Sequence, residues 1–440
     1  LSIYEHLSSM ATRWRPRFDS PPEPQEIRSY INAGLQLLAG TPTSREYIAF
    51  LTYEAFWYIR QLDDAPSTQK ADLVEHALES GHRALSMAEE LDNPRTLSLT
   101  IDAMGFIYLV YHRYTRAREL QDRRLGLVHL LTDKEELYDL YVSLGGAHEQ
   151  VADYAGALSH YGQAYSYAMS MESPAMVLNA IIGRMRVWRR WNRWDETQKV
   201  AQEILQFIDK YQQDEKRQQW AIEALATIAY HRGQQERGDE YARQLKRLTD
   251  QQMAASKTPA GINTKMHAIY LAQENWSRAL SDYQEKVNRS EPFPDPEVLA
   301  TLAELMVTTE QTEGIEEICN RAVHHSESSG ASKSHAVALR ARGRLFASRQ
   351  LWEQAEADLR ASLSLCEKLD LPWESAHTHY YLGLLYKQRA EQPAESRTRE
   401  SDLSMAHNYL ERALGFYESL QALPAMKRTR AALRESITIG

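Results

Sequence analysis

Residues 343–355 read Gly-Arg-Leu-Phe-Ala-Ser-Arg-Gln-Leu-Trp-Glu-Gln-Ala, and the order of their small and aromatic positions recurs along the chain. Phe346 comes three residues after Gly343. Trp352 follows six residues later, and Ala355 three residues after that. A spacing that recurs at a fixed period indicates a repeat architecture, in which each copy is one small unit of secondary structure.

The position held by Trp352 recurs at intervals of about 40 residues. It is occupied in turn by Tyr114, Tyr154, Trp194, Gln235, Trp276, Thr312 and Trp352. A degenerate copy precedes these around residues 53–91, and a further copy with Gly383 and Ala406 follows them. The pattern therefore predicts about nine copies.

Each copy is typical of a helix hairpin. In residues 352–369 the apolar stripe has a spacing of three to four, and it consists of Trp352, Ala355, Leu359, Leu363 and Cys366. Pro94, Pro174 and Pro372 stand where a second helix must stop. Since a single hairpin cannot bury its apolar face, the copies must stack on one another. We expect an all-α fold.

The motif Gly-x-x-Tyr/Phe, then Trp/Tyr-x-x-Ala, then a terminal Pro resembles the tetratricopeptide repeat family over residues 45–423. The resemblance implies a right-handed superhelical solenoid of about nine antiparallel helix hairpins, whose first helices line the concave face. The period exceeds the family's usual 34 residues, so we expect helices longer by about a turn. Such long-period arrays are similar to the sensor arrays of bacterial signal-transduction ATPases and of the maltose-regulon activator group.

Three segments are expected. Residues 1–44 read as a capping helix and a linker, with an apolar stripe made of Ile3, Leu7, Met10 and Trp14 before a proline-rich run. Residues 45–423 form the repeat array, in which a polar insertion near residues 391–401 interrupts the last copy. Residues 424–440 read as a closing helix, because a solenoid needs polar ends.

Composition restricts the classes of partner. The chain has 440 residues and a net charge of −9, which argues against non-specific binding to nucleic acid. It has no run of about 18 apolar residues and no secretory signal, so we expect no membrane partner. Cys319 and Cys366 are too few for a disulfide framework and fall on helix-packing positions. We expect buried thiols in a reducing, cytoplasmic compartment.

Motifs that carry chemistry are missing from the sequence. It contains no glycine-rich phosphate loop, no H-E-x-x-H, no C-x-x-C and no G-x-S-x-G. The close histidine pairs, 324–325 and 377–379, point to different faces of a helix and make poor metal chelates. We therefore expect no enzyme activity, no cofactor and no metal site.

A candidate binding surface follows from the resemblance, which implies exposed inner positions at fixed steps from the small residue of each first helix. These steps select Arg186, Arg189, Arg190, Tyr230, His231, Arg340, Arg344, Tyr380 and Lys387. Residues 184–194 are the most basic and aromatic segment of the chain. Arginine forks recognise carboxylates and phosphates bidentately, although the same arginines can instead pair with carboxylates of neighbouring hairpins.

The leading hypothesis is a non-catalytic scaffold or sensor module that binds a protein or peptide, an acidic one included, in the concave groove. It would serve as the sensor arm of a larger regulatory protein. The alternative is the small-molecule sensor domain of a transcription activator, with an anionic metabolite or a sugar as its ligand. Nucleic acid is not expected as a partner.

Overall fold

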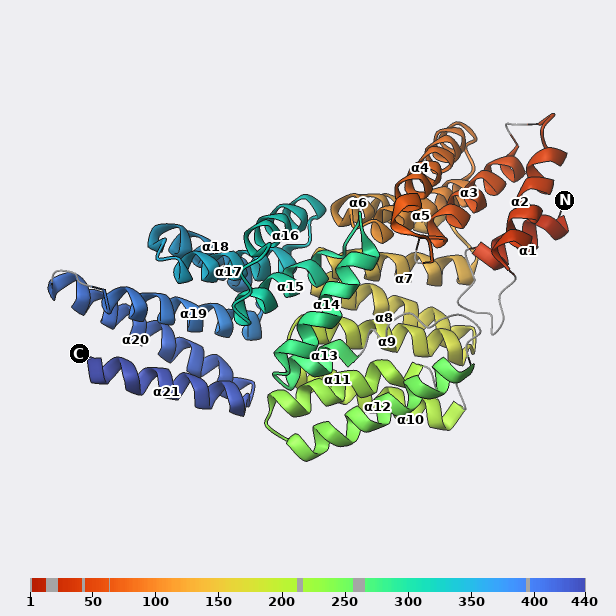
Figure 1. Cartoon of the computed structure of the whole chain (residues 1–440). Helices are drawn as coiled ribbons and strands as arrows, with labels where there is room; N and C mark the ends of the chain where they lie inside the picture. Colours follow the sequence, from red (N-terminus) through yellow and green to blue (C-terminus); the bar gives the residue numbers. More distant parts are fainter. Residues whose placement is uncertain are drawn as a thin grey trace. The chain divides into compact units, whose positions relative to one another are not determined.

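The computed structural model describes residues 2–12, 23–41, 44–62, 64–211, 217–255, 266–392 and 396–439. In this part of the chain the fold is all-α, with 84% helix and no strand, as the sequence predicts (Figure 1). None of its helices is both long enough and apolar enough to cross a membrane. Trp14 and most of the proline-rich linker lie outside the described residues.

Among the helices of the described residues, nine successive pairs from α3/α4 to α19/α20 correspond to the expected hairpins. Their bounds are α1 Ser2–Thr12, α2 Pro24–Leu37, α3 Arg45–Arg60, α4 Ser67–Glu90, α5 Pro94–Val110, α6 Tyr114–Leu125, α7 Lys134–Gln150, α8 Tyr154–Ser170, α9 Pro174–Arg190, α10 Trp194–Tyr211, α11 Gln218–His231, α12 Gln235–Ala255, α13 Met266–Ala272, α14 Trp276–Ser290, α15 Pro296–Thr308, α16 Ile315–Ser329, α17 Ser332–Ser348, α18 Trp352–Lys368, α19 Pro372–Ala390, α20 Ser396–Ser419 and α21 Leu423–Ile439. A short 3-10 helix, η2, covers Val128–Leu130.

The register of the second helices agrees with the sequence pattern. Six of them begin on the expected residue, namely Tyr114, Tyr154, Trp194, Gln235, Trp276 and Trp352. The exception is α16, which begins at Ile315 rather than Thr312. Gly314 directly before it has a φ of 70°, so the helix cannot extend back through that residue.

Uniform helix lengths explain the spacing of the repeats. Helices α7, α8 and α9 each have 17 residues, as do α17 and α18. Three residues separate one such helix from the next, so a hairpin and its turns occupy about 40 residues. Pro94, Pro174 and Pro372 are each the first residue of the following helix, where the missing N–H costs nothing.

Small residues set the distance between the two helices of a hairpin. A Cβ atom on Gly343 would lie 2.9 Å from Cγ of Leu359 and 3.1 Å from the carbonyl oxygen of Ala355. Helices α17 and α18 therefore pack more closely than a larger side chain would allow. First helices also contact the first helix of the next hairpin, as α15 does with α17 and α17 with α19.

Contacts between residues divide the chain into two compact units. The repeat pattern in the sequence does not predict this division. Unit 1 comprises residues 1–151, 159–171 and 287–295, and unit 2 comprises residues 152–158, 172–286 and 296–440. In unit 2 the core includes one cluster that joins helices distant in sequence. It contains Trp194 and Ile228 together with Ala376, Tyr380, Leu410, Ala413 and Tyr417, so α10 and α11 pack with α19 to α21.

Candidate functional site

Two adjoining hollows in unit 2 are lined mainly by the first helices of the last three hairpins. Hollow A has a volume of about 510 Å³, and hollow B of about 420 Å³. Both lie in the range that is usual for ligand-binding cavities. They share Arg344, Tyr381 and Leu384, so they adjoin along α15, α17 and α19, and the two together are called the groove.

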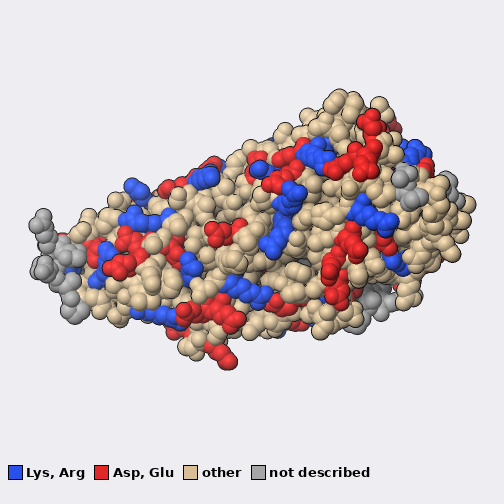
Figure 2. Space-filling model, turned by 90° about the horizontal axis from the view of Figure 1, so that it is seen from above, with Lys and Arg blue, Asp and Glu red and all other residues tan. Residues whose placement is uncertain are grey.

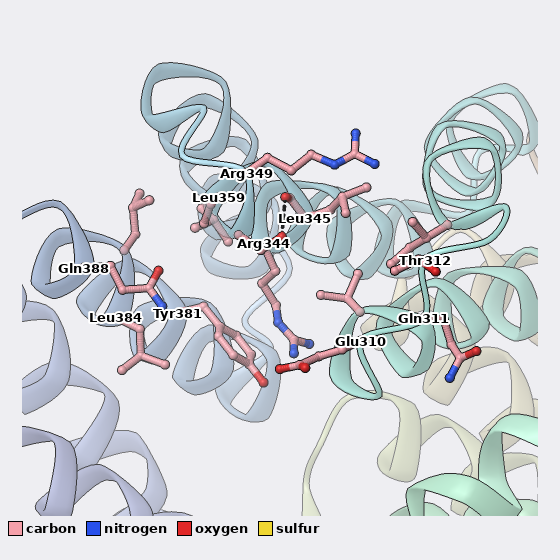
Figure 3. A pocket seen from close by; sticks show the side chains of 15 residues that line it. Glu310, Gln311, Thr312, Arg344, Leu345, Arg349, Leu359, Tyr381, Leu384 and Gln388 are labelled. Atoms are coloured by element: carbon pink, nitrogen blue, oxygen red, sulfur yellow. Dashed lines mark hydrogen bonds between the residues drawn. The ribbon is translucent and has the colours of Figure 1, made fainter. Parts of the chain in front are cut away.

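Hollow A is largely apolar inside and polar at its rim (Figure 3). Its apolar surface comes from Val307, Ile315, Leu345, Ala347, Leu359, Leu384 and Leu385. Its polar groups include Glu310, Gln311, Arg349 and Gln388. Figure 3 shows the Arg344 side chain pointing into this hollow between Tyr381 and Glu310. Such a surface can take up an apolar side chain and hydrogen-bond the chain that carries it.

Hollow B contains a buried ion-pair network centred on Arg340. The Arg340 side chain is only 2% exposed. Its Nε and Nη2 donate to the two carboxylate oxygens of Glu304 at 2.6 and 2.9 Å, and Nη1 lies 2.9 Å from Glu374. Burial raises the pKa of Glu374, but the charges of Arg340 and Lys333 together outweigh it and hold the pKa below its usual value. This network fixes the facing sides of α15, α17 and α19.

A second set of ion pairs lies beside the first. Arg190 pairs with Glu297, and Nζ of Lys333 donates to the carbonyl oxygen of Arg190 at 2.9 Å. The charge of Arg190 lowers the pKa of Glu297 to about 2. Nη1 of Arg428, which α21 contributes, lies 2.9 Å from Oε1 of Glu274. Positive and negative charges are thus closely matched in hollow B.

Aromatic rings enclose the other end of hollow B. The His231 imidazole stacks on Trp194 at 5.3 Å between ring centroids and lies 4.6 Å from Trp373. The His377 ring centroid lies 4.2 Å from that of Trp373. Burial lowers the pKa of His231 to about 4 and that of His377 well below its usual value. Both imidazoles are therefore neutral near pH 7.

The structure brings four of the nine candidate residues around one hollow. His231, Arg340, Arg344 and Tyr380 all line hollow B. Lys387 lies on α19 outside both hollows, where it pairs with Glu435 at 2.6 Å.

The other candidates are held in contacts of their own. Arg189 donates to Glu223 at 2.7 Å, and Arg190 pairs with Glu297. Arg186 is half-buried on α9 and lines neither hollow. Tyr230, expected to be exposed, is buried, and its hydroxyl donates to Asp239 at 2.7 Å. Carboxylates of neighbouring helices therefore pair with Arg189 and Arg190 of the basic segment on α9.

The face of the molecule seen in Figure 2 has no extended basic patch, because Lys and Arg alternate there with Asp and Glu. Among the described residues no group of three His, Cys, Asp or Glu side chains is placed to hold a metal ion. Cys319 and Cys366 are both buried, and burial raises the pKa of each thiol to about 12. A thiol with so high a pKa is a poor nucleophile.

Several groove residues were missed in the sequence, although a signal for some of them exists. The steps used for the other hairpins, applied to Ala303, lead to Glu297, Glu304 and Thr308, all of which line hollow B. Arg428 has no comparable signal, because only the packing of α21 brings it to the groove.

No protein-family model matches the chain, and a search of the curated proteins gives no match. Among solved structures, the chain is similar to a Rap protein in complex with competence and sporulation factor, with 10% identity, a TM-score of 0.41 and coverage of 90% of this chain and 98% of that one. The apo form of the quorum sensor NprR from B. thuringiensis gives 10% identity and a TM-score of 0.41, over 92% of this chain and 97% of that one.

A third similar structure is BtubC (BKLC) from P. vanneervenii, with 15% identity and a TM-score of 0.43, over 53% of this chain and 92% of that one. Likenesses at these identities and TM-scores carry no argument about a ligand or a partner.

Proposed function

We propose that the chain is a non-catalytic binding scaffold, whose groove along α15, α17 and α19 takes up a segment of a partner protein or a peptide. The observation that carries this proposal is that hollows A and B adjoin and are both lined by Arg344, Tyr381 and Leu384. A groove of two joined hollows suits an extended chain, which can place one side chain in each.

The lining of the groove supports the same proposal. Tyr380, Tyr381 and Trp373 offer rigid aromatic surface, which contributes strongly to binding at protein interfaces. The matched charges of hollow B favour a peptide over a small anionic metabolite. A free anion would have to separate cations such as Arg340 from carboxylates that already satisfy them.

Selection of random displayed peptides on the full chain tests the proposal. Recovered peptides are synthesised, and their dissociation constants are measured by fluorescence anisotropy. Leu384→Trp fills the junction of the two hollows, so we expect it to weaken binding at least tenfold, about 1.4 kcal/mol. Leu130→Trp is the matched control, because Leu130 is exposed on η2 in unit 1 and we expect binding to be unchanged.

Helical circular dichroism establishes that both variants are folded. Recovery of no peptide above the background of an unrelated helical protein would contradict the proposal. Equal binding by Leu384→Trp and the wild-type chain would place the peptide elsewhere and remove the groove from the proposal.

A further inference from the structure

We infer that Arg344 is the specificity-determining residue of the groove, and that it selects an Asp or Glu side chain next to a bulky apolar side chain held in hollow A. The inference rests on the proposed function and deepens it, because it names the class of peptide. It depends on which of the groove's cations already have a close anionic partner.

The other cations of the groove are each engaged by a carboxylate. Arg340 has Glu304 and Glu374 within 3 Å, and Arg428 has Glu274 at 2.9 Å. Arg349, at the rim of hollow A, lies 2.6 Å from Glu316. Lys333 lies 3.6 Å from Glu374 and also donates to a backbone carbonyl. An incoming carboxylate would have to compete with these partners.

Arg344 has only a long ion pair with a carboxylate. Its nearest carboxylate oxygen belongs to Glu304 and is 4.0 Å away, and both oxygens of that carboxylate already accept from Arg340. Glu310 is exposed at the rim of hollow A and forms no ion pair with Arg344. Arg344 is therefore the groove arginine whose nearest carboxylate is already bound, at shorter distances, by another cation.

The Arg344 guanidinium is also held in position for a ligand. It lies 4.0 Å from the centroid of the Tyr381 ring, and Nη2 donates to the Thr308 hydroxyl at 3.0 Å. A guanidinium has five N–H donors in a planar fork, so several remain for an incoming group. Because its plane is fixed by the ring and the hydroxyl, it can bind a carboxylate bidentately at a small cost in side-chain entropy.

The surroundings indicate where in the peptide the carboxylate lies. Arg344 stands at the junction of the hollows, so the groove continues on both sides of it. A carboxylate bound there belongs to a side chain within the segment rather than to the end of a chain. Hollow A, with Leu345, Leu359 and Leu385, offers about 510 Å³ of mainly apolar space to a neighbouring side chain. At about 3.3 Å per residue, that side chain is within a few positions of the acid.

A charge-reversal selection tests the inference. Random displayed peptides are selected on the wild-type chain, on Arg344→Glu and on Arg430→Glu, the control, which lies on α21 outside both hollows and pairs with Glu418. We expect acidic residues beside a bulky apolar residue with the wild type and the control. Arg344→Glu should enrich Lys or Arg at the same place and keep the apolar neighbour.

Titrations then separate this inference from the proposed function. An amidated wild-type-selected peptide and its Asp→Asn form are measured against the wild-type chain and Arg344→Gln, whose shape is closer to the native one. We expect the Asp→Asn change to weaken binding at least tenfold to the wild type and by less than twofold to Arg344→Gln.

Equal losses on both chains, or selected peptides without an acidic preference, would overturn the inference and leave the proposed function standing. If binding depends on a free C-terminal carboxylate, the inference about an internal side chain is also wrong. If neither chain recovers any peptide, the proposed function fails, and this inference fails with it.

Discussion

Glycines at the helix contacts let neighbouring helices approach closely, because they have no side chain. A Cβ on Gly383 would lie 2.6 Å from Leu410 and 3.2 Å from the carbonyl oxygen of Ala406. Gly343 has an equally close neighbour in the backbone of Ala355. A leucine tip can move aside, whereas the backbone of a packed helix cannot, so overpacking at these glycines is costly.

Gly343→Ala and Gly415→Ala should therefore have opposite effects on the stability of unit 2. Both glycines are in helices, where alanine gains about 1 kcal/mol from helix propensity. No atom lies within 4 Å of a Cβ on Gly415, so we expect that gain to raise the melting temperature. At Gly343 we expect overpacking to exceed the gain and to destabilise by about 1 kcal/mol net. Scanning calorimetry measures both, and a higher melting temperature for Gly343→Ala would contradict the packing argument.

At the level of the helices, one type of turn recurs between neighbours. A residue with positive φ ends a helix, one further residue follows, and the next helix begins, as with Gln350, Leu351 and Trp352. The Leu351 N–H donates to the carbonyl of Phe346 at 3.0 Å, which is the hydrogen bond of a Schellman motif. The same bond joins Arg193 to Trp188 and Leu371 to Cys366. This turn fixes the three-residue separation of the helices.

Gln350→Gly should stabilise the chain by about 0.5–1 kcal/mol, because glycine has no steric penalty at a φ of 60°. Gln354→Gly provides a matched control four residues later, inside α18, where the same substitution should cost about 1 kcal/mol. Gln350→Val should also destabilise, since β-branched residues avoid positive φ. Chemical denaturation followed by circular dichroism measures all three, and a loss of stability with Gln350→Gly would contradict this explanation.

At the level of unit 2, the contact between α11 and α21 joins helices that are far apart in the chain. In the same region His231 and His377 both lie against Trp373, and Arg428 pairs with Glu274. The charges that act on the two imidazoles are those of Arg340, Arg428 and Glu374. The two arginines add to the effect of burial, so protonation of the histidines opposes this packing.

The stability of unit 2 should therefore fall as the solution is acidified. In the unfolded chain a histidine takes up its proton near pH 6.5, whereas His231 in the folded chain does so only near pH 4. The contribution of the neutral imidazole is complete above pH 6.5 and is lost as the pH falls from 6.5 towards 4. We expect a cost of about 2 kcal/mol at pH 5 from His231 alone.

Thermal melts followed by tryptophan fluorescence between pH 5 and 7.5 measure this loss. His377→Gln keeps a donor for the Trp373 carbonyl, which lies 3.0 Å from Nδ1 of His377, but it has no imidazole to protonate. We expect this variant to show a smaller fall in melting temperature. A pH dependence equal to that of the wild-type chain would exclude His377 as a contributor.

The repeating contacts within hairpins could be predicted without coordinates, because they follow from residues close together in the chain. The order Gly343, Phe346, Trp352 and Ala355 was enough to predict where most second helices begin. Of the nine inner positions that the family resemblance implied, His231, Arg340, Arg344 and Tyr380 line hollow B. The same local pattern did not predict the positive φ of Gln350, since no sequence signal identifies a residue other than glycine in that conformation.

Charge partners and long-range packing depended on the folded chain. Arg190 was predicted as a residue of the binding surface, with pairing to a carboxylate of a neighbouring hairpin as the alternative, and packing brings Glu297 from α15 to it. Arg428 was placed in a closing helix, yet it lines hollow B beside Glu274. Residues more than a hundred positions apart meet only when helices stack and turn back on one another, and the angles of that stacking come from the summed packing of many side chains. No short segment of sequence determines these packing angles, whereas the spacing of apolar residues within each segment is enough to indicate a helix.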